Sequence, residues 1–334
     1  MKKIIITGAN GFIGSNILMW FEKTKDLEPI GMVRKKSNLI RLKNSNSPIL
    51  TYPDTRDGLV EILKGAVGIV NTAGKASYKG RYEDFYNSNV QFPLELIDAA
   101  IRAGVEKFIH IGSTVIYGFK GNINTTEDKN PEPYKNPYCI TKKICEEKLL
   151  EYSDRIEIYI FRPATVYGPW DFSLTFSLLS SLEKGLRLFP GGGKTLTSPC
   201  YVKNLAYATE CAIFDKGNSG AYNISDGNDM KWIDFLTLFS SELNVRPPKL
   251  GIPTLPLLFI FKVLEYIETF TGIRLPEAVS TALIAQVSKD YSFSIEKAIN
   301  KLHYKAPYST IQGVRESVLW YLEQKSKMPS QESP

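Results

Sequence analysis

Histidine and cysteine are scarce in this chain. The 334 residues include two histidines and four cysteines, Cys139, Cys145, Cys200 and Cys211, which show no CxxC spacing and no paired pattern. A zinc site built from nitrogen and sulfur ligands is therefore not expected, and no metal is predicted. The thiols are expected to be reduced, and the sequence predicts a cytoplasmic protein.

Long hydrophobic runs are also missing. The first apolar run, Ile4–Ile6, is too short for a signal peptide. The most apolar stretch, Leu255–Phe270, is interrupted by three charged residues and falls short of the ~20 apolar residues of a membrane-spanning helix. The sequence therefore predicts no transmembrane segment.

A strong imbalance of charge is absent as well. The net charge is +6, and the lysines and arginines interleave with aspartates and glutamates along the whole chain. A nucleic-acid-binding face would gather the cations, so nucleic acid is not an expected partner.

The first two-thirds of the chain alternate short β-branched runs with amphipathic stretches. The predicted strands are Lys3–Thr7, Pro29–Arg34, Gly68–Thr72, Lys107–Ile111, Ile156–Phe161 and Ala221–Ile224. The predicted helices between them include Phe12–Lys23, Phe92–Ala103 and Tyr138–Tyr152. Strands separated by helices at this spacing predict an α/β fold with a doubly wound, mostly parallel sheet.

The character of the sequence changes after about Thr165, where the rest is expected to be mostly helical. We predict a dinucleotide-binding domain of residues 1–165 together with about 200–226. A smaller substrate domain is predicted over residues 166–199 and 227–324, and residues 325–334 are expected to form a frayed tail.

The segment Thr7–Gly14, TGANGFIG, follows a predicted strand and opens a predicted helix. In this context the three glycines permit a tight turn, close approach of a pyrophosphate, and close packing of the helix on the strand. Free N–H groups at the start of the helix would hold the anion. A purely structural turn is the other interpretation, which the position after three isoleucines disfavours. The predicted cofactor-binding residues of this loop are Gly8, Asn10, Gly11, Phe12, Ile13 and Gly14.

The end of the second predicted strand indicates which dinucleotide binds. An NAD-specific site usually offers a carboxylate to the ribose there, but this chain has Arg34, Lys35, Lys36 and Ser37. A guanidinium suits the 2′-phosphate of NADP, whereas a solvated basic loop is the other interpretation. We predict NADP(H) as the preferred cofactor and NAD(H) as the alternative, with NADPH at least ten times tighter, a gap of ~1.4 kcal/mol.

Tyr138 and Lys142 lie four residues apart in a predicted helix, so both side chains share one face. An ammonium group one turn away is expected to lower the pKa of the phenol from about 10 and make it a usable proton relay. Ser113, just after the strand Lys107–Ile111, is the candidate donor to a substrate oxygen. A YxxxK pattern can also arise by chance in a chain with 18 tyrosines.

Together these motifs resemble the extended branch of the short-chain dehydrogenase/reductase superfamily, also called the NAD-dependent epimerase/dehydratase family. The segments that carry the resemblance span nearly the whole chain and are Thr7–Gly14, Asp54–Asp57 (expected to be the end of a strand), Asn71–Gly74, Asn89–Val90, Ser113–Gly118, Tyr138–Lys142, Arg162–Pro169 and Tyr201–Asn204. The resemblance implies a Rossmann-type fold with Ser113, Tyr138 and Lys142 as catalytic residues. It further implies cofactor contacts from Asp54, Thr55, Thr72, Ala73, Gly74, Tyr138, Lys142 and Pro163.

The chain departs from the nucleotide-sugar members of this family. They carry an arginine where Thr197 stands, and Leu283–Ser288 contains no arginine either, so a substrate diphosphate would be poorly compensated. Leu255–Phe270 followed by Gly272–Pro276 instead resembles the 3β-hydroxysteroid dehydrogenase-like subgroup. This similarity implies a hydrophobic substrate or contact with a membrane surface through residues 255–270, unless the stretch is an ordinary packed helix.

The leading hypothesis is reversible hydride transfer between NADP(H) and a small-molecule secondary alcohol or ketone, hydrophobic or lipid-like. A nucleotide-sugar epimerase, dehydratase or ketoreductase, with Lys194 as a substitute cation, is the alternative. A non-catalytic NAD(P)-binding sensor is a third, disfavoured by the retained Tyr/Lys pair. The family resemblance also implies a homodimer through the helices Phe92–Ala103 and Tyr138–Tyr152.

Overall fold

The computed structural model describes residues 1–327 except 187, 274 and 277–278, and at its centre lies a seven-stranded sheet. The strands of this sheet are β1 (Lys2–Thr7), β2 (Leu27–Val33), β3 (Ile49–Thr51), β4 (Gly68–Asn71), β5 (Lys107–Ile111), β7 (Glu157–Pro163) and β12 (Gly220–Ile224). They pair in parallel in the order β12-β7-β5-β4-β1-β2-β3. The strand order reverses between β1 and β4, which is the place where doubly wound sheets bind ligands at their carboxyl ends.

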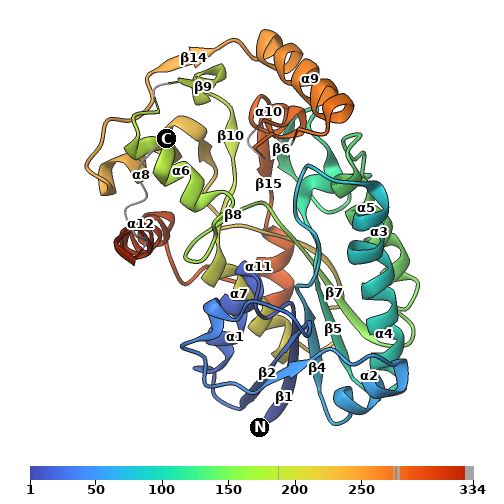
Figure 1. Ribbon diagram of the computed structural model, residues 1–334. Helices are drawn as coiled ribbons and strands as arrows, with labels where there is room; N and C mark the ends of the chain where they lie inside the picture. The colour runs from blue at the N-terminus through green and yellow to red at the C-terminus, as the bar shows by residue number, and fades with distance from the viewer. Residues whose placement is uncertain (187, 274, 277–278, 328–334) are drawn as a thin grey trace.

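Helices cover both faces of this sheet (Figure 1). One face carries α1 (Phe12–Phe21), α7 (Val202–Phe214) and α11 (Glu296–Leu302), and the other carries α2 (Arg56–Leu63), α4 (Phe92–Arg102) and α5 (Pro137–Leu150). The short helix α3 (Tyr82–Tyr86) contacts α5. Two separate apolar cores result, and strands such as β5 are buried along their whole length. This double coverage explains why the strands are almost continuously apolar.

The predicted doubly wound fold is confirmed, and most predicted boundaries agree with the structure to within two residues. One expectation was wrong: Asp54–Asp57 does not end a strand, because β3 stops at Thr51 and Arg56 already opens α2. Charged residues after a short edge strand form a turn and a helix start here.

The remainder of the chain is mostly helical, which confirms the expectation, and it also contains several short strands. One small sheet consists of the four strands β6 (Asn122–Thr125), β10 (Leu196–Thr197), β13 (Met230–Lys231) and β15 (Tyr291–Phe293). A second sheet pairs β8 (Thr165–Tyr167) with β11 (Pro199–Tyr201), and a third pairs β9 (Leu188–Pro190) with β14 (Leu250–Ile252). The helices are α6 (Thr175–Glu183), α8 (Trp232–Glu242), α9 (Thr254–Thr271), α10 (Thr281–Val287) and α12 (Thr310–Lys327). The division into two domains stays a prediction.

Helix α9 runs along the outer edge of this second part (Figure 1). None of its eighteen residues is buried, and Leu257, Leu258, Phe261 and Leu264 are half-buried, so Leu255–Phe270 packs on the protein by one face only. Within the described residues, no helix is long and apolar enough to cross a membrane. Of the predicted frayed tail, residues 325–327 belong to α12, and residues 328–334 lie outside the described part of the chain.

Candidate active site

The glycine loop lies between the end of β1 and the start of α1. Gly8 adopts a positive φ of 67°, and an added Cβ would lie 2.9 Å from the Cα of Ala73. An added Cβ at Gly14 would lie 2.4 Å from the carbonyl oxygen of Gly8. No side chain caps the start of α1, so its first N–H groups are left for another acceptor. Such a backbone cradle fits a pyrophosphate.

Thr72 and its neighbours connect this loop to the catalytic helix. The Thr72 hydroxyl donates to the carbonyl oxygen of Thr7 at 2.7 Å, and Ala73 lies against Gly8. A Cβ at Gly74 would be 3.9 Å from the Nζ of Lys142. The segment Thr72–Gly74 therefore lies between the glycine loop and Lys142. The family resemblance implies that the cofactor binds at this place.

Four further predicted cofactor residues follow the strands β2 and β3. They are Arg34 and Lys35 after β2, and Asp54 and Thr55 after β3. Lys35 forms an exposed ion pair with Asp54, and the Thr55 hydroxyl caps α2 by accepting from Gly58 N at 3.1 Å. Arg34 is exposed and makes no ion pair within the described residues. The hydroxyl of Ser37 is buried and finds no partner among the described residues. Within the described residues, the Ser37 hydroxyl and the Arg34 guanidinium are therefore both available to a phosphate near the carboxyl end of β2.

The structure brings Ser113 and Tyr138 together at the carboxyl end of β5. Ser113 begins the 3₁₀ turn η3 (Thr114–Tyr117), where its Oγ accepts from Val115 N at 3.3 Å, and it also hydrogen-bonds the phenol of Tyr138. Tyr138 is the second residue of α5, and the Asn136 side chain caps that helix by accepting from Tyr138 N at 3.0 Å. The cap fixes the helix start and hence the position of the phenol.

The expected effect of Lys142 on the phenol is not found. Burial raises the pKa of Tyr138 to about 12, and only the hydrogen bond from Ser113 opposes this rise. The Lys142 ammonium donates instead to the carbonyl oxygen of Ile111 at 2.9 Å, and burial lowers its own pKa. The sequence prediction overlooked the cost of removing water from a phenolate, which here exceeds the attraction of a cation that faces the backbone.

A buried polar chain beneath Lys142 was missed by sequence reasoning. The amide oxygen of Asn71 accepts from the Thr7 hydroxyl at 2.7 Å, so its Nδ2 faces His110 Nδ1 at 3.0 Å. His110 Nε2 then carries the proton and points at the Cys145 thiol, 3.6 Å away. Burial and the nearby Lys142 hold the pKa of His110 well below its usual value. The only signal in the sequence was a polar residue inside each of two apolar strands.

Two further residues that the sequence analysis did not assign hold the site together. Buried Asn89 accepts from Lys75 N at 2.7 Å and donates to Thr141 Oγ1 at 3.2 Å, which connects the segment after Gly74 to α5. Arg41 donates to the carbonyl oxygens of Asn10 and Trp170, each at 3.2 Å, and so connects the glycine loop to the chain after β8.

A cavity of about 710 Å³ opens in front of Ser113 and Tyr138. Phe12, Ile13 and Pro163, three predicted cofactor residues, line the same cavity. Much of its wall is apolar and comes from the second part of the chain, including Val166, Phe172, Leu178, Trp232, Leu283 and Val287.

The described lining of this cavity contains one charged side chain, the carboxylate of Asp171, and no cation. Asp171 accepts hydrogen bonds from the amides of Ser173 and Thr175 and is thus used within its own turn. Thr197 is fully buried, with its hydroxyl 2.8 Å from that of Thr165, and Lys194 is exposed and does not line the cavity. The described wall therefore offers no cation to a diphosphate.

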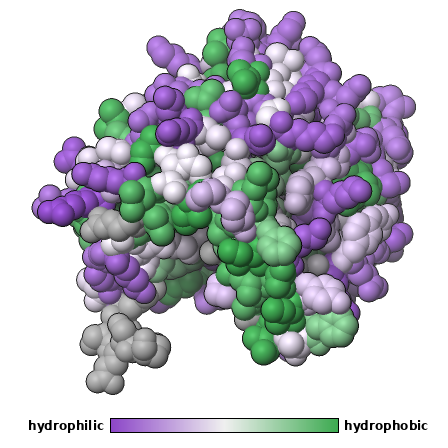
Figure 2. Space-filling model, turned by 90° about the horizontal axis from the view of Figure 1, so that it is seen from above, coloured by the Kyte–Doolittle hydropathy of each residue, from purple (hydrophilic) through white to green (hydrophobic). Residues whose placement is uncertain are grey.

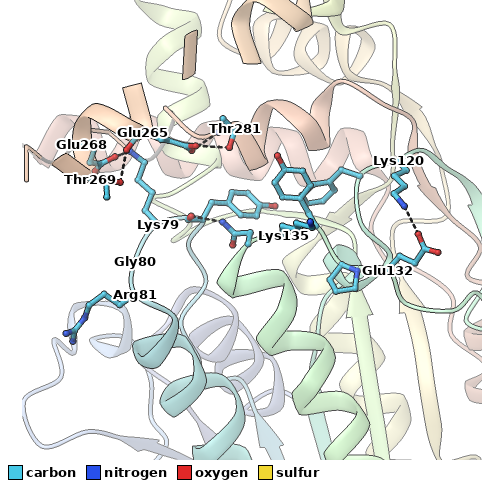
Figure 3. A pocket seen from close by; sticks show the side chains of 15 residues that line it. Lys79, Gly80, Arg81, Lys120, Glu132, Lys135, Glu265, Glu268, Thr269 and Thr281 are labelled. Atoms are coloured by element: carbon cyan, nitrogen blue, oxygen red, sulfur yellow. Dashed lines mark hydrogen bonds and ion pairs between the residues drawn. The ribbon is translucent and has the colours of Figure 1, made fainter. Parts of the chain in front are cut away.

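A second pocket, of about 900 Å³, lies under α9 (Figure 3). Tyr78 lines both hollows: its ring packs on that of Tyr138 with centroids 5.9 Å apart, and its hydroxyl donates to Gln286 at 2.7 Å. Lys79 donates to Glu268 of α9 at 2.7 Å across this pocket. Tyr78 thus forms a common wall between the catalytic cavity and the space under α9.

Comparisons with known proteins show what this chain is similar to. The model of the NAD dependent epimerase/dehydratase family matches residues 4–225. The 3beta-hydroxysteroid-dehydrogenase/decarboxylase isoform 2 of Arabidopsis thaliana is 25% identical over 94% of this chain, which spans only 61% of that relative's length. The sterol-4-alpha-carboxylate 3-dehydrogenase, decarboxylating, of Dictyostelium discoideum is 25% identical over 95% of this chain and 100% of its own.

Solved structures share the fold. The UDP-glucuronic acid 4-epimerase from Bacillus cereus in complex with NAD superimposes with a TM-score of 0.75 at 20% identity, covering 96% of this chain and 99% of that chain. Identity this low speaks for the architecture and not for the substrate.

Proposed function

Because the chain belongs to the NAD dependent epimerase/dehydratase family, we propose that it interconverts a secondary alcohol and a ketone by hydride transfer, on a hydrophobic or lipid-like substrate. The sterol dehydrogenase relatives confirm the predicted placement in the extended short-chain dehydrogenase/reductase branch and its 3β-hydroxysteroid dehydrogenase-like subgroup. The chain is accordingly an NAD-dependent enzyme. The observation that supports this substrate class is the apolar, cation-free described wall of the cavity in front of Ser113 and Tyr138.

In the proposed mechanism, a bound nicotinamide would supply or accept the hydride, and side chains of this protein would hold and transfer the proton. A phenol with a pKa of about 12 is protonated at neutral pH, so Tyr138 is ready to donate to a carbonyl oxygen during reduction. Ser113, hydrogen-bonded to that phenol, would hold the same oxygen. Lys142, fixed on the carbonyl of Ile111 beside Gly74, would position the ribose side of the cofactor.

We propose NADP(H) as the preferred form of the cofactor, with NAD(H) as the alternative. Among the described residues, the Arg34 guanidinium forms no ion pair and the Ser37 hydroxyl has no partner, which supports a 2′-phosphate, while Lys35 is already paired with Asp54. A cytoplasmic location and a homodimer through α4 and α5 also stay proposals.

The test of the mechanism is Tyr138→Phe. General acid–base catalysis contributes about 10²- to 10⁴-fold, so kcat on a panel of sterols and other apolar ketones and alcohols should fall by that factor. Cofactor affinity should change less than about twofold, because only the hydroxyl is removed. Tyr134→Phe is the matched control, since Tyr134 packs on Phe119 with centroids 5.4 Å apart, outside the catalytic cavity.

A variant that kept wild-type kcat would contradict the assignment of Tyr138. If the wild-type protein bound NADPH but turned over nothing on the panel, the non-catalytic sensor would become the better description.

The second candidate is a nucleotide-sugar epimerase, dehydratase or ketoreductase, because the family model that matches residues 4–225 is that of NAD dependent epimerases and dehydratases. A thermal-shift screen with UDP-, GDP- and dTDP-sugars separates the two candidates. A bound ligand at 100 times its Kd stabilises by ~2.7 kcal/mol, so a clear rise in Tm with one sugar nucleotide would reverse the ranking.

A further inference from the structure

Helix α10 contributes one side of the catalytic cavity, and α9 holds it in place. The outer face of α9 is the band of hydrophobic side chains that lies between hydrophilic flanks in Figure 2. Its carboxylate Glu265 points the other way and accepts from the amide and the hydroxyl of Thr281, both at 2.8 Å (Figure 3). Ser280 caps the same helix by accepting from Leu283 N at 3.5 Å. The start of α10 is therefore fixed, and Gln286 lines the cavity from the second turn of this helix.

The side-chain amide of Gln286 has a defined orientation. Its Oε1 accepts from the hydroxyl of Tyr78 at 2.7 Å. Burial raises the pKa of Tyr78 well above its usual value, so this hydroxyl keeps its proton and remains a donor. Because the amide oxygen faces Tyr78, the Nε2 group with its two protons faces away from that residue. Within the described residues, this Nε2 donates to no acceptor.

Tyr78 is itself attached to the start of the catalytic helix. Its ring packs in a T-shaped arrangement on the ring of Tyr138, with centroids 5.9 Å apart. Its carbonyl oxygen accepts from Asn136 Nδ2 at 2.8 Å, and Asn136 is the residue that caps α5. The amide of Gln286 is therefore held at a defined place relative to the catalytic phenol, with the side chain of Tyr78 between them.

Hydroxyl groups elsewhere in the cavity wall are already used as donors. The Ser177 hydroxyl donates to the carbonyl oxygen of Phe172 at 3.2 Å, and the Ser181 hydroxyl donates to that of Ser177 at 2.7 Å. The Nε2 of Gln286 differs from them because its protons have no acceptor within the described residues. A donor without a partner in an apolar wall is costly unless a ligand supplies an acceptor. The amide therefore marks a place where an otherwise apolar ligand should carry an oxygen.

We propose that Gln286 is a specificity-determining residue whose Nε2 donates to a second oxygen of the substrate, and that Tyr78 is the positioning residue that orients this amide. The inference rests on the proposed function and narrows its substrate class. The substrate would be an apolar alcohol or ketone with a second, hydrogen-bond-accepting oxygen, separated from the reacting carbon by a spacing that the Tyr78 side chain spans. A molecule without that oxygen leaves the amide unpaired and is disfavoured.

The experiment is isothermal titration of steroid ketones into the full chain in the presence of NADP⁺, which cannot reduce them. Monoketones are compared with diketones of the same ring skeleton, so that only the second oxygen differs. The wild type should bind the diketone about tenfold more tightly, which is within what one hydrogen bond between neutral groups contributes. Gln286→Leu should abolish this difference by weakening the diketone alone. Leucine and glutamine have similar helix propensities, so α10 should persist.

Tyr78→Phe tests the positioning role. It keeps the ring on Tyr138 and removes only the hydroxyl that orients the amide, so the diketone should lose about threefold in affinity and the monoketone nothing. The double variant Tyr78→Phe/Gln286→Leu leaves no unpaired hydroxyl behind. Its loss should be about tenfold and not thirtyfold, because Tyr78 acts through Gln286. Gln91→Leu makes the same exchange at an exposed glutamine outside the cavity, and it should change neither affinity.

Equal affinities of the wild type for the two ketones would overturn the proposal. So would a preference for the diketone that survives both Gln286→Leu and the double variant. A preference that depends on Gln286, in a protein that reduces neither ketone with NADPH, would support the inferred contact and contradict the proposed reaction. Reduction of both ketones without any preference in binding would leave the proposed reaction in place and refute the inferred contact.

Discussion

Helices α1 and α9 are both apolar in sequence, yet the fold uses them in opposite ways. Six of the ten residues of α1 are buried, whereas none of the eighteen residues of α9 is. Helix α1 packs against the parallel sheet and directly follows the glycine loop, whereas α9 lies at the outer edge of the molecule, beyond the short strands (Figure 1). Apolar composition therefore predicts a helix in both places, but only the neighbouring elements decide whether it is buried.

The largest difference between the two helices should appear in stability. Phe21 of α1 is fully buried, so Phe21→Ala should lower the free energy of unfolding by ~3–5 kcal/mol through lost contacts and a cavity. Phe259 of α9 is 70% exposed, and Phe259→Ala should change stability by no more than about 0.5 kcal/mol. Urea unfolding of each variant measures both changes in the free energy of unfolding. If Phe259→Ala cost as much as Phe21→Ala, α9 would have to be packed in solution, which would break the comparison.

The next largest effect should appear in NADPH affinity, when a glycine at each of the two helices is replaced. A Cβ at Gly14 of α1 would lie 2.4 Å from Gly8 O and 2.6 Å from the Thr72 hydroxyl, so Gly14→Ala must widen the cradle. We expect NADPH affinity to fall about 100-fold, or ~2.7 kcal/mol. Gly272, which ends α9 with a φ of 71°, has nothing within 4 Å, and Gly272→Asn should leave affinity unchanged because asparagine tolerates this conformation.

Isothermal titration of NADPH into each glycine variant gives these two affinities directly. Unchanged affinity in Gly14→Ala would mean that the loop does not hold the phosphates, and the cofactor site would have to be sought elsewhere.

The sequence specified the α1 side of the molecule well because its signals are local. The glycine loop Thr7–Gly14, the strand β5 and the pair Tyr138 and Lys142 are each local in the sequence, and local patterns of this kind can be recognised without knowing the rest of the chain. The carboxyl ends of neighbouring parallel strands meet at one edge, which is why Ser113 and Tyr138 could be expected together.

The rest of the site depends on contacts between distant residues. The chain from Asn71 through His110 to Cys145 joins two strands and a helix and leaves no linear motif. The pKa of Tyr138 depends on burial by several elements, so residue spacing alone gave the wrong direction. The apolar wall of the cavity likewise collects Phe172, Trp232 and Leu283, which are far apart in sequence.

The smallest effect tests an exposed residue on the α1 side. Arg34 is exposed to solvent like Phe259 of α9, but its proposed partner is the 2′-phosphate of one cofactor molecule. Arg34→Gln should therefore weaken NADPH about tenfold, or ~1.4 kcal/mol, and leave NADH affinity unchanged. Lys43→Gln removes a similarly exposed cation after the nearby turn η1 (Ile40–Leu42) and serves as the control. Equal affinities of the wild type for NADPH and NADH would show that Arg34 belongs to a solvated basic loop. The basic residues after β2 would then be a local pattern that predicted the wrong ligand, on the side of the molecule where local patterns were otherwise most informative.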